Sequence, residues 1–202
     1  MFFSFWGSTI VSPQRTFREI LRQDSVCFGF GSLLLYSFLY VITGLFLVIN
    51  HLQPTVPPLL PINEESYYFW QLFFTFPVSL LGWLVLGCIA YLLTTKLLKA
   101  NGSLKDYLKV LGFSFYIPCI ITMWLPETLT AIFHPEWWGE PSAGGTLVRV
   151  VSQIYLYVGF IWAFALSMLA IKETSSASWF KSALIALLSI AVTMGFYLIF
   201  IR

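Results

Sequence analysis

Ionisable side chains near long apolar segments are where this sequence could do chemistry, and Glu127 is the foremost candidate. It follows Pro126 and lies about one membrane thickness, roughly 20 residues, after Leu108. An ionisable residue within a membrane span is by default a functional hypothesis. Two interpretations stay open: a solvated or capping carboxylate at the outer interface, which is favoured, or a polar site in a cavity beneath a helix break.

Other candidates for catalysis or metal binding lack the necessary spacing. Histidines and acids such as His51, His134 and Glu136 show none of the short, regular spacing of metal ligands. The three cysteines form no CxxC pair, and neither an HExxH nor a GxSxG motif occurs. We therefore expect no enzymatic activity, no metal and no cofactor.

The elements that would position Glu127 are membrane helices. Of 202 residues, 58% are hydrophobic and 10% are charged, whereas soluble domains carry about 25% charged residues. The pattern predicts an all-α membrane protein: an N-terminal segment, 1–26, followed by one domain, 27–202. Its five transmembrane helices are expected at about 27–49, 69–98, 104–133, 147–171 and 179–201. With a net charge of +2 and no basic patch interleaved with aromatic residues, nucleic acid is not an expected partner.

Prolines interrupt the second and third predicted spans. Pro77 lies inside the second, and Pro118 and Pro126 lie inside the third. Each proline leaves the carbonyl one turn earlier without its usual donor, and in lipid that carbonyl needs a neighbouring helix, a hydroxyl or water. Ser114, four residues before Pro118, marks such a place. Together with Glu127, these residues are the candidates for a helix break or cavity.

Small residues recur every four positions in the last two predicted spans. Gly159, Ala163 and Ser167 form one such stripe, and Ala191 and Gly195 repeat the spacing. Small side chains allow helices to approach closely in a membrane. We predict that these five residues lie at helix-packing faces.

The N-terminal segment reads as a short amphipathic helix that begins at Ser12 and Pro13. Phe17 and Ile20 share one face, and arginines occupy the other. This helix could lie on the membrane with its arginines toward headgroups, or it could pack on the inner end of the bundle. Both alternatives stay open.

Basic residues gather on one side of the predicted membrane, where nine of the eleven Lys and Arg residues fall. By the positive-inside rule, the N-terminus is expected in the cytoplasm and the C-terminus outside. Arg149 and Arg202 are the two on the opposite side. The expected basic surface, which would face anionic lipid or a partner, comprises Arg15, Arg18, Arg22, Lys96, Lys99, Lys105 and Lys109.

Two stretches resemble the Yip membrane domain, of the Ypt-interacting-protein family. Residues 12–20, SPQRTFREI, are similar to its proline-then-phenylalanine lead-in, and residues 102–112, GSLKDYLKVLG, with Pro118 following, are similar to its basic loop and third-helix start. The resemblance covers Ser12 to the end and implies the five-span plan. Eukaryotic members have long cytoplasmic N-terminal regions and are tied to small GTPases and vesicle traffic. Here the first span begins near Cys27, as in short prokaryotic members, so the resemblance does not extend to GTPase binding.

Two classes of function are consistent with these observations. The first is a non-enzymatic interaction, assembly or membrane-organising factor that contacts lipid and another membrane protein or a second copy of itself. The second is a small-molecule or lipid conduit built around the proline-broken second and third helices. Either would be a multi-pass protein, in the plasma membrane of a prokaryote or in an endomembrane of a eukaryote.

The orientation can be tested with a reporter enzyme fused after Arg202. If the reporter works only in the cytoplasm, we expect the fusion to be inactive. The positive-inside rule places the nine basic residues in the cytoplasm and the C-terminus on the other side of the membrane. An active cytoplasmic reporter would overturn the predicted topology.

Overall fold

The computed structural model describes residues 2–100, 102–138 and 145–201, apart from the side chains of 97, 147–149 and 152. Within these ranges the regular elements are helices, and loops such as 50–63 connect them. The helices are α1 (Phe2–Val11), α2 (Pro13–Leu21), α3 (Cys27–Ile49), α4 (Glu64–Leu92), α5 (Leu104–Cys119), α6 (Leu125–Phe133), α7 (Gly145–Ser175) and α8 (Trp179–Phe200). Two π-helical turns, η1 (Leu93–Leu97) and η2 (Ile120–Trp124), follow α4 and α5, and a 3-10 turn, η3 (Pro135–Trp137), follows α6.

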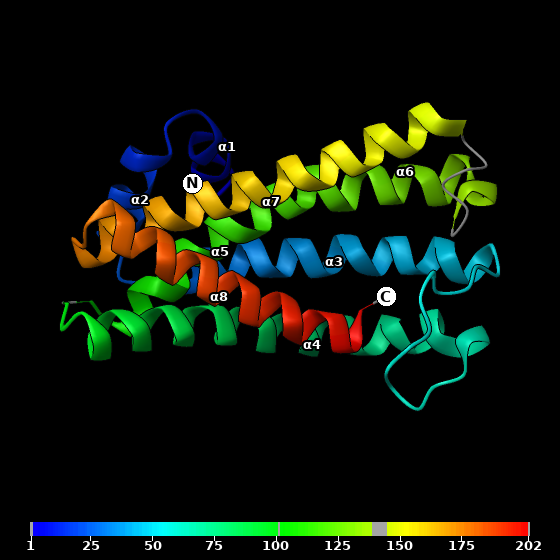
Figure 1. The fold of residues 1–202 in the computed structure, drawn as a ribbon, viewed down its shortest axis with the longest axis horizontal. Coiled ribbons are helices and arrows are strands. Elements are labelled where there is room, and N and C mark those ends of the chain that lie inside the picture. Colours follow the sequence, from blue (N-terminus) through cyan, green and yellow to red (C-terminus); the bar gives the residue numbers. More distant parts are fainter. Residues whose placement is uncertain (1, 101, 139–144, 202) are drawn as a thin grey trace.

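Five helices are long and apolar enough to cross a membrane, as the sequence predicted. They are α3, α4 with its π turn, the continuous run α5–η2–α6, α7 and α8, and they lie roughly along one long axis (Figure 1). The second begins at Glu64, five residues earlier than expected, because Asn63 caps it and accepts a hydrogen bond from the Glu65 amide.

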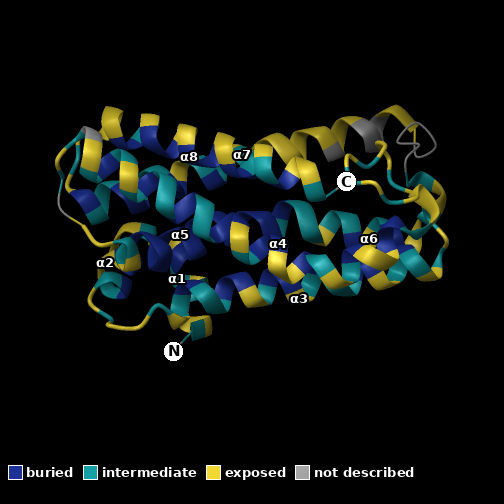
Figure 2. Ribbon diagram, turned by 90° about the horizontal axis from the view of Figure 1, so that it is seen from below, coloured by how far each residue is buried: buried dark blue, intermediate teal, exposed yellow. Residues whose placement is uncertain are grey.

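The third span is the centre of the bundle. In its most apolar 18-residue window 78% of the residues are buried, against 28–44% in the other four spans. α5 contacts α3, α4 and α7 and is almost wholly buried (Figure 2). It starts with a capping box, in which Ser103 and Asp106 each bond the other's backbone N–H.

Two glycines allow α3 and α5 to pack with their backbones in contact. A Cβ atom added at Gly112 would lie 2.5 Å from the Gly29 carbonyl oxygen, and one at Gly29 would clash with the Leu108 carbonyl. On another side of α5, Trp83 of α4 donates its indole N–H to the Leu108 carbonyl at 3.0 Å. These contacts fix the inner half of α5 between its neighbours.

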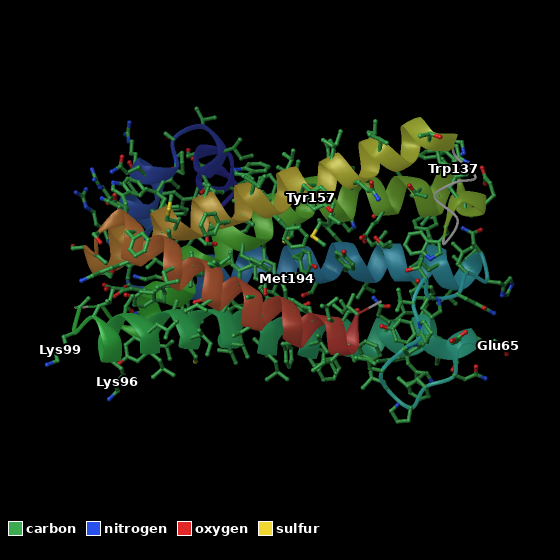
Figure 3. All side chains as sticks on the ribbon, in the orientation of Figure 1. Glu65, Lys96, Lys99, Trp137, Tyr157 and Met194 are labelled. Carbon is green, nitrogen blue, oxygen red and sulfur yellow. The ribbon has the colours of Figure 1, made fainter. Side chains whose placement is uncertain are left out.

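The two ends of the bundle differ in charge. The end that carries α2, the close of α4 and the start of α5, called the inner end here, holds nine basic and four acidic side chains and therefore five net positive charges. Figure 3 shows Lys96 and Lys99 at this end and Glu65 and Trp137 at the other. Which end faces the cytoplasm remains the prediction from the positive-inside rule.

The N-terminal segment contains two helices where the sequence analysis expected one. α1 is apolar and packs by Phe5 against Phe28 of α3. α2 lies on the inner end of the bundle, because Phe17 and Ile20 are fully buried there and Arg18 pairs with Glu173 of α7 at 2.7 Å. Of the two alternatives left open, the packed position is the one in the structure, and the arginines still face outward.

The glycine contact predicts a selective effect on stability. Gly112→Ala should lower the free energy of unfolding by about 1–3 kcal/mol, because the added methyl group overpacks against the backbone of Gly29. The matched control is Gly195→Ala, whose Cβ meets nothing within 4 Å and which should keep or raise stability through its higher helix propensity. Thermal melting of the purified variants in detergent measures both. Equal melting temperatures would contradict close packing of α3 on α5.

Candidate functional site

The third span departs from regular α-helical geometry between its two prolines, and this π-helical departure within a continuous helix is called the break here. The π turn η2 lies between Pro118 and Pro126, and α6 begins after it. Two threonine hydroxyls donate hydrogen bonds to backbone carbonyls around this break. Thr122 donates to the Pro118 carbonyl at 2.8 Å, and Thr128 donates to the Trp124 carbonyl at 2.8 Å. Both bonds stay within the third span and surround its π turn.

Beyond the break, polar contacts hold α6 against α3. The Thr43 and Thr128 hydroxyls lie 2.6 Å apart, and Asn50 donates to the Ala131 carbonyl at 2.9 Å. Trp124 donates its indole N–H to the Leu39 carbonyl at 2.7 Å. These bonds follow one face of α3 and keep the outer half of the third span on it.

A cavity of about 610 Å³ lies in the outer half of the bundle. α7 and α8 diverge toward this end (Figure 1), and residues of both line the cavity together with α3, Gln71 of α4, the third span and the outer loops. Leu156 of α7 and Leu198 of α8 line it and are themselves exposed on the surface of the bundle. The cavity is therefore open toward the bilayer.

Glu127 supplies the carboxylate of this cavity. Its Oε2 accepts a hydrogen bond from the Tyr40 hydroxyl at 2.8 Å, and the residue lies three positions after the end of the π turn η2. The sequence analysis favoured a solvated or capping carboxylate. Glu127 lines this cavity and is half-buried, as the second alternative describes, and its role there stays a prediction.

Tyrosines close the cavity toward the centre of the bundle. The Tyr116 hydroxyl donates to the Ser79 carbonyl at 3.1 Å and lies 2.9 Å from the Tyr197 hydroxyl. The rings of Tyr36 and Tyr116 pack with centroids 5.0 Å apart, and Phe115 stacks on Tyr197. Tyr36, Phe115 and Tyr197 thus line the inner part of the cavity, and Tyr116 contacts Tyr36 and Tyr197 from behind.

The basic inner end is the second region of interest, and one prediction about it was wrong. Lys109 is not part of the exposed surface: it is 2% exposed, and its Nζ donates to the carbonyls of Leu21 and Gln23 at 3.2 and 2.7 Å. Asp106 lies 2.8 Å from the same nitrogen. The cause is the position of α2, whose C-terminal carbonyls cover the helix face that carries Lys109.

The other six predicted basic residues are exposed. Arg15 pairs with Glu19 and Arg18 with Glu173, and the hydrogen bond that Arg18 donates to Glu173 raises the pKa of the Arg18 guanidinium. Arg22, Lys96, Lys99 and Lys105 have no salt-bridge partner among the described residues. This end therefore offers unpaired cations to an anionic surface.

Comparison with protein families identifies the chain. The model of the Yip1 domain matches residues 7–201, nearly the whole length. The protein belongs to the Yip1 domain family. A search of curated proteins and of solved structures finds no match.

Membership confirms the resemblance drawn from residues 12–20 and 102–112 and agrees with the multi-pass architecture. It assigns no catalytic residue to the Yip1 domain. Among the described residues, no group of three His, Cys, Asp or Glu side chains comes together as a metal site, and the three cysteines are free. Arg202 lies outside the described residues, as does the side chain of Arg149.

The two small-residue stripes of the Yip1 domain have different surroundings. On α7, Gly159 faces Thr122, and the Ser167 hydroxyl lies 3.1 Å from that of Ser114 on α5. Ser114 thus bonds across to α7 near Pro118. On α8, Ala191 and Gly195 are exposed, and a Cβ atom added at Gly195 would meet nothing within 4 Å in the described part of the chain. α4 continues through Pro77 as one helix, and Pro77 does not line the cavity.

Sequence reasoning missed Tyr40 and Gln71 as parts of the site. The signal that could have found Tyr40 is its spacing of four residues from Tyr36 within an apolar span, which places both phenols on one helix face. Gln71 follows Trp70 in an aromatic belt and carries no such signal. The partner of Glu127 is 87 residues away in the chain, so no local pattern reveals it.

The tie between Lys109 and α2 can be tested by Lys109→Met. The variant should destabilise the docking of α2 by about 1–3 kcal/mol, because two backbone carbonyls and Asp106 lose a buried donor. Limited proteolysis should then cleave residues 21–26 faster. Lys105→Met, which removes an exposed lysine one turn earlier, is the control and should cleave like the parent. Equal cleavage of both variants would show that Lys109 does not hold α2.

Proposed function

We propose that this Yip1-domain protein is a non-enzymatic membrane-organising factor that gathers anionic lipid at its basic inner end and assembles with a partner membrane protein. The excess of five positive charges at that end is the observation that carries the proposal. Each basic residue near an anionic surface contributes about 1 kcal/mol. Four cations without a salt-bridge partner are therefore enough to enrich anionic lipid around the protein.

The position of α2 supports this function. Because Phe17 and Ile20 are buried in the bundle, α2 is held rigidly and presents Arg15 and Arg22 outward. Lys96 and Lys99 from the end of α4 and Lys105 from the start of α5 add to the same end. A preorganised set of cations loses little conformational entropy on binding.

The exposed face of α8 supports assembly with another membrane protein. Ala191 and Gly195 form a four-residue repeat of small side chains, and a second transmembrane helix could approach closely there. α8 is also the least buried of the five spans, at 28% in its most apolar window. A helix of a partner complex, or of a second copy of this chain, fits this face.

A conduit is the second candidate, and the cavity is the observation in its favour. Broken helices line the cavities of transporters, and η2 borders this one. Its floor is closed by the bonded Tyr116 and Tyr197, and below it α3 and α5 are in backbone contact. Transport would require all of these contacts to open, so the geometry supports binding better than passage.

Lipid enrichment tests the proposed function. The protein is reconstituted in vesicles of equal phosphatidylglycerol and phosphatidylcholine, extracted in polymer discs, and the lipid ratio of the discs is measured. We expect enrichment of phosphatidylglycerol that is lost in Lys96→Gln/Lys99→Gln/Lys105→Gln and weakened by salt, because exposed charges are screened.

The matched control is Glu64→Gln/Glu65→Gln at the opposite end, which should leave the enrichment unchanged. The assembly role is read in parallel from native membranes, where a stoichiometric membrane partner should co-purify with the parent protein. Equal lipid ratios for the parent and the triple variant would contradict the proposal, and so would recovery of the protein without a partner.

A further inference from the structure

The cavity around Glu127 points to a ligand of defined chemistry. We propose that it binds a membrane amphiphile with a primary ammonium headgroup, such as an aminophospholipid, with the ammonium on Glu127 and an acyl chain between α7 and α8. This proposal does not depend on the basic inner end, which lies at the opposite end of the bundle. It rests on the polar groups of the cavity, its depth and its opening.

Two acceptor oxygens of the cavity lack a donor among the described residues. Glu127 uses one carboxylate oxygen to accept from Tyr40, and no hydrogen bond occupies the other among the described residues. Gln71 is 4% exposed, lines the cavity, and its Oε1 has no hydrogen-bond partner in the described part of the chain. A buried acceptor left unpaired is costly, and such groups mark places where a donor is missing.

The carboxylate of Glu127 makes the cavity a suitable site for a cation. No lysine, arginine or histidine lines it within the described residues, so Glu127 has no positive partner from this chain. A carboxylate in an apolar membrane cavity is costly unless a cation pairs with it. A primary ammonium supplies one positive charge and three donors. The aromatic rings of Tyr36 and Tyr40, 4.8 Å apart between centroids, add surfaces that favour a cation.

The depth of Glu127 matches the headgroup of a lipid in the outer leaflet. The residue lies 19 positions after Leu108, which corresponds to about 28 Å along a helix at 1.5 Å per residue, close to the thickness of the hydrocarbon. Trp137 and Trp138, typical interfacial residues, line the same cavity. An ammonium at Glu127 would therefore sit at its natural depth in the membrane.

The walls below Glu127 suit an acyl chain. Met194 of α8 and Phe160 of α7 line the cavity deeper in the bundle, and Figure 3 shows Met194 between these two helices. Exposed leucines of both helices border the opening, so a chain can pass sideways into the bilayer. A soluble amine would leave these apolar walls unfilled, which favours an amphiphile.

Native mass spectrometry of the delipidated full chain tests the proposal. The protein is titrated with phosphatidylethanolamine and with phosphatidylcholine of identical acyl chains, whose trimethylammonium group has no N–H donor. We expect phosphatidylethanolamine to bind at least about tenfold more tightly, and Glu127→Gln to remove about tenfold of that affinity, because hydrogen bonds to a charged group are lost. Glu64→Gln, an exposed acid outside the cavity, is the control and should bind as the parent does.

Further variants distinguish the outcomes. Tyr40→Phe keeps the shape of the site and should still bind, whereas Met194→Trp should fill the chain-binding part and weaken phosphatidylethanolamine without affecting methylamine. Equal binding of the two phospholipids, or unchanged binding by Glu127→Gln, would overturn the proposal. Binding of methylamine as tight as that of the phospholipid would assign the site to a soluble cation and overturn the lipid. None of these results bears on the basic inner end.

Discussion

The burial of the third span on all sides is the constraint on which the rest of the structure depends. α3, α4 and α7 surround α5, and the glycine pair Gly29 and Gly112 brings two backbones into contact. A helix packed so closely cannot shift along its axis, since each neighbour fits into a different face. The position of α2 depends on this burial, because the buried Lys109 on α5 donates hydrogen bonds to carbonyls at the end of α2.

The same constraint explains why the outer half of the bundle is open. After Ile120 the chain can no longer continue as a regular helix between its neighbours, because two prolines interrupt its hydrogen bonds. The π turn directs α6 onto α3, where Thr128 and Asn50 bonds hold it. α7 and α8 then diverge, and the space between them contains the carboxylate of Glu127. The break in the third span and the polar cavity therefore lie in the same part of the bundle.

The sequence predicts much of the architecture and less of the site. Long apolar runs, the capping box at Ser103 and the prolines predict the spans and the break, because each is a local pattern with a local cause. α1 was missed since an apolar stretch of ten residues has no periodic signal of its own. The burial of Lys109 and the pairing of Glu127 with Tyr40 depend on helices far apart in the chain, so periodicity cannot reveal them.

Two candidate regions thus lie at opposite ends of a closely packed centre: a set of cations at the inner end and the cavity that contains Glu127 at the outer end. The most direct test is an experimental structure of the full chain in discs of native lipid. It should show α5 buried up to Ile120 and an amphiphile between the outer halves of α7 and α8, with its headgroup within hydrogen-bond distance of Glu127. α7 and α8 closed against each other, with Glu127 facing outer water, would contradict this view of the protein.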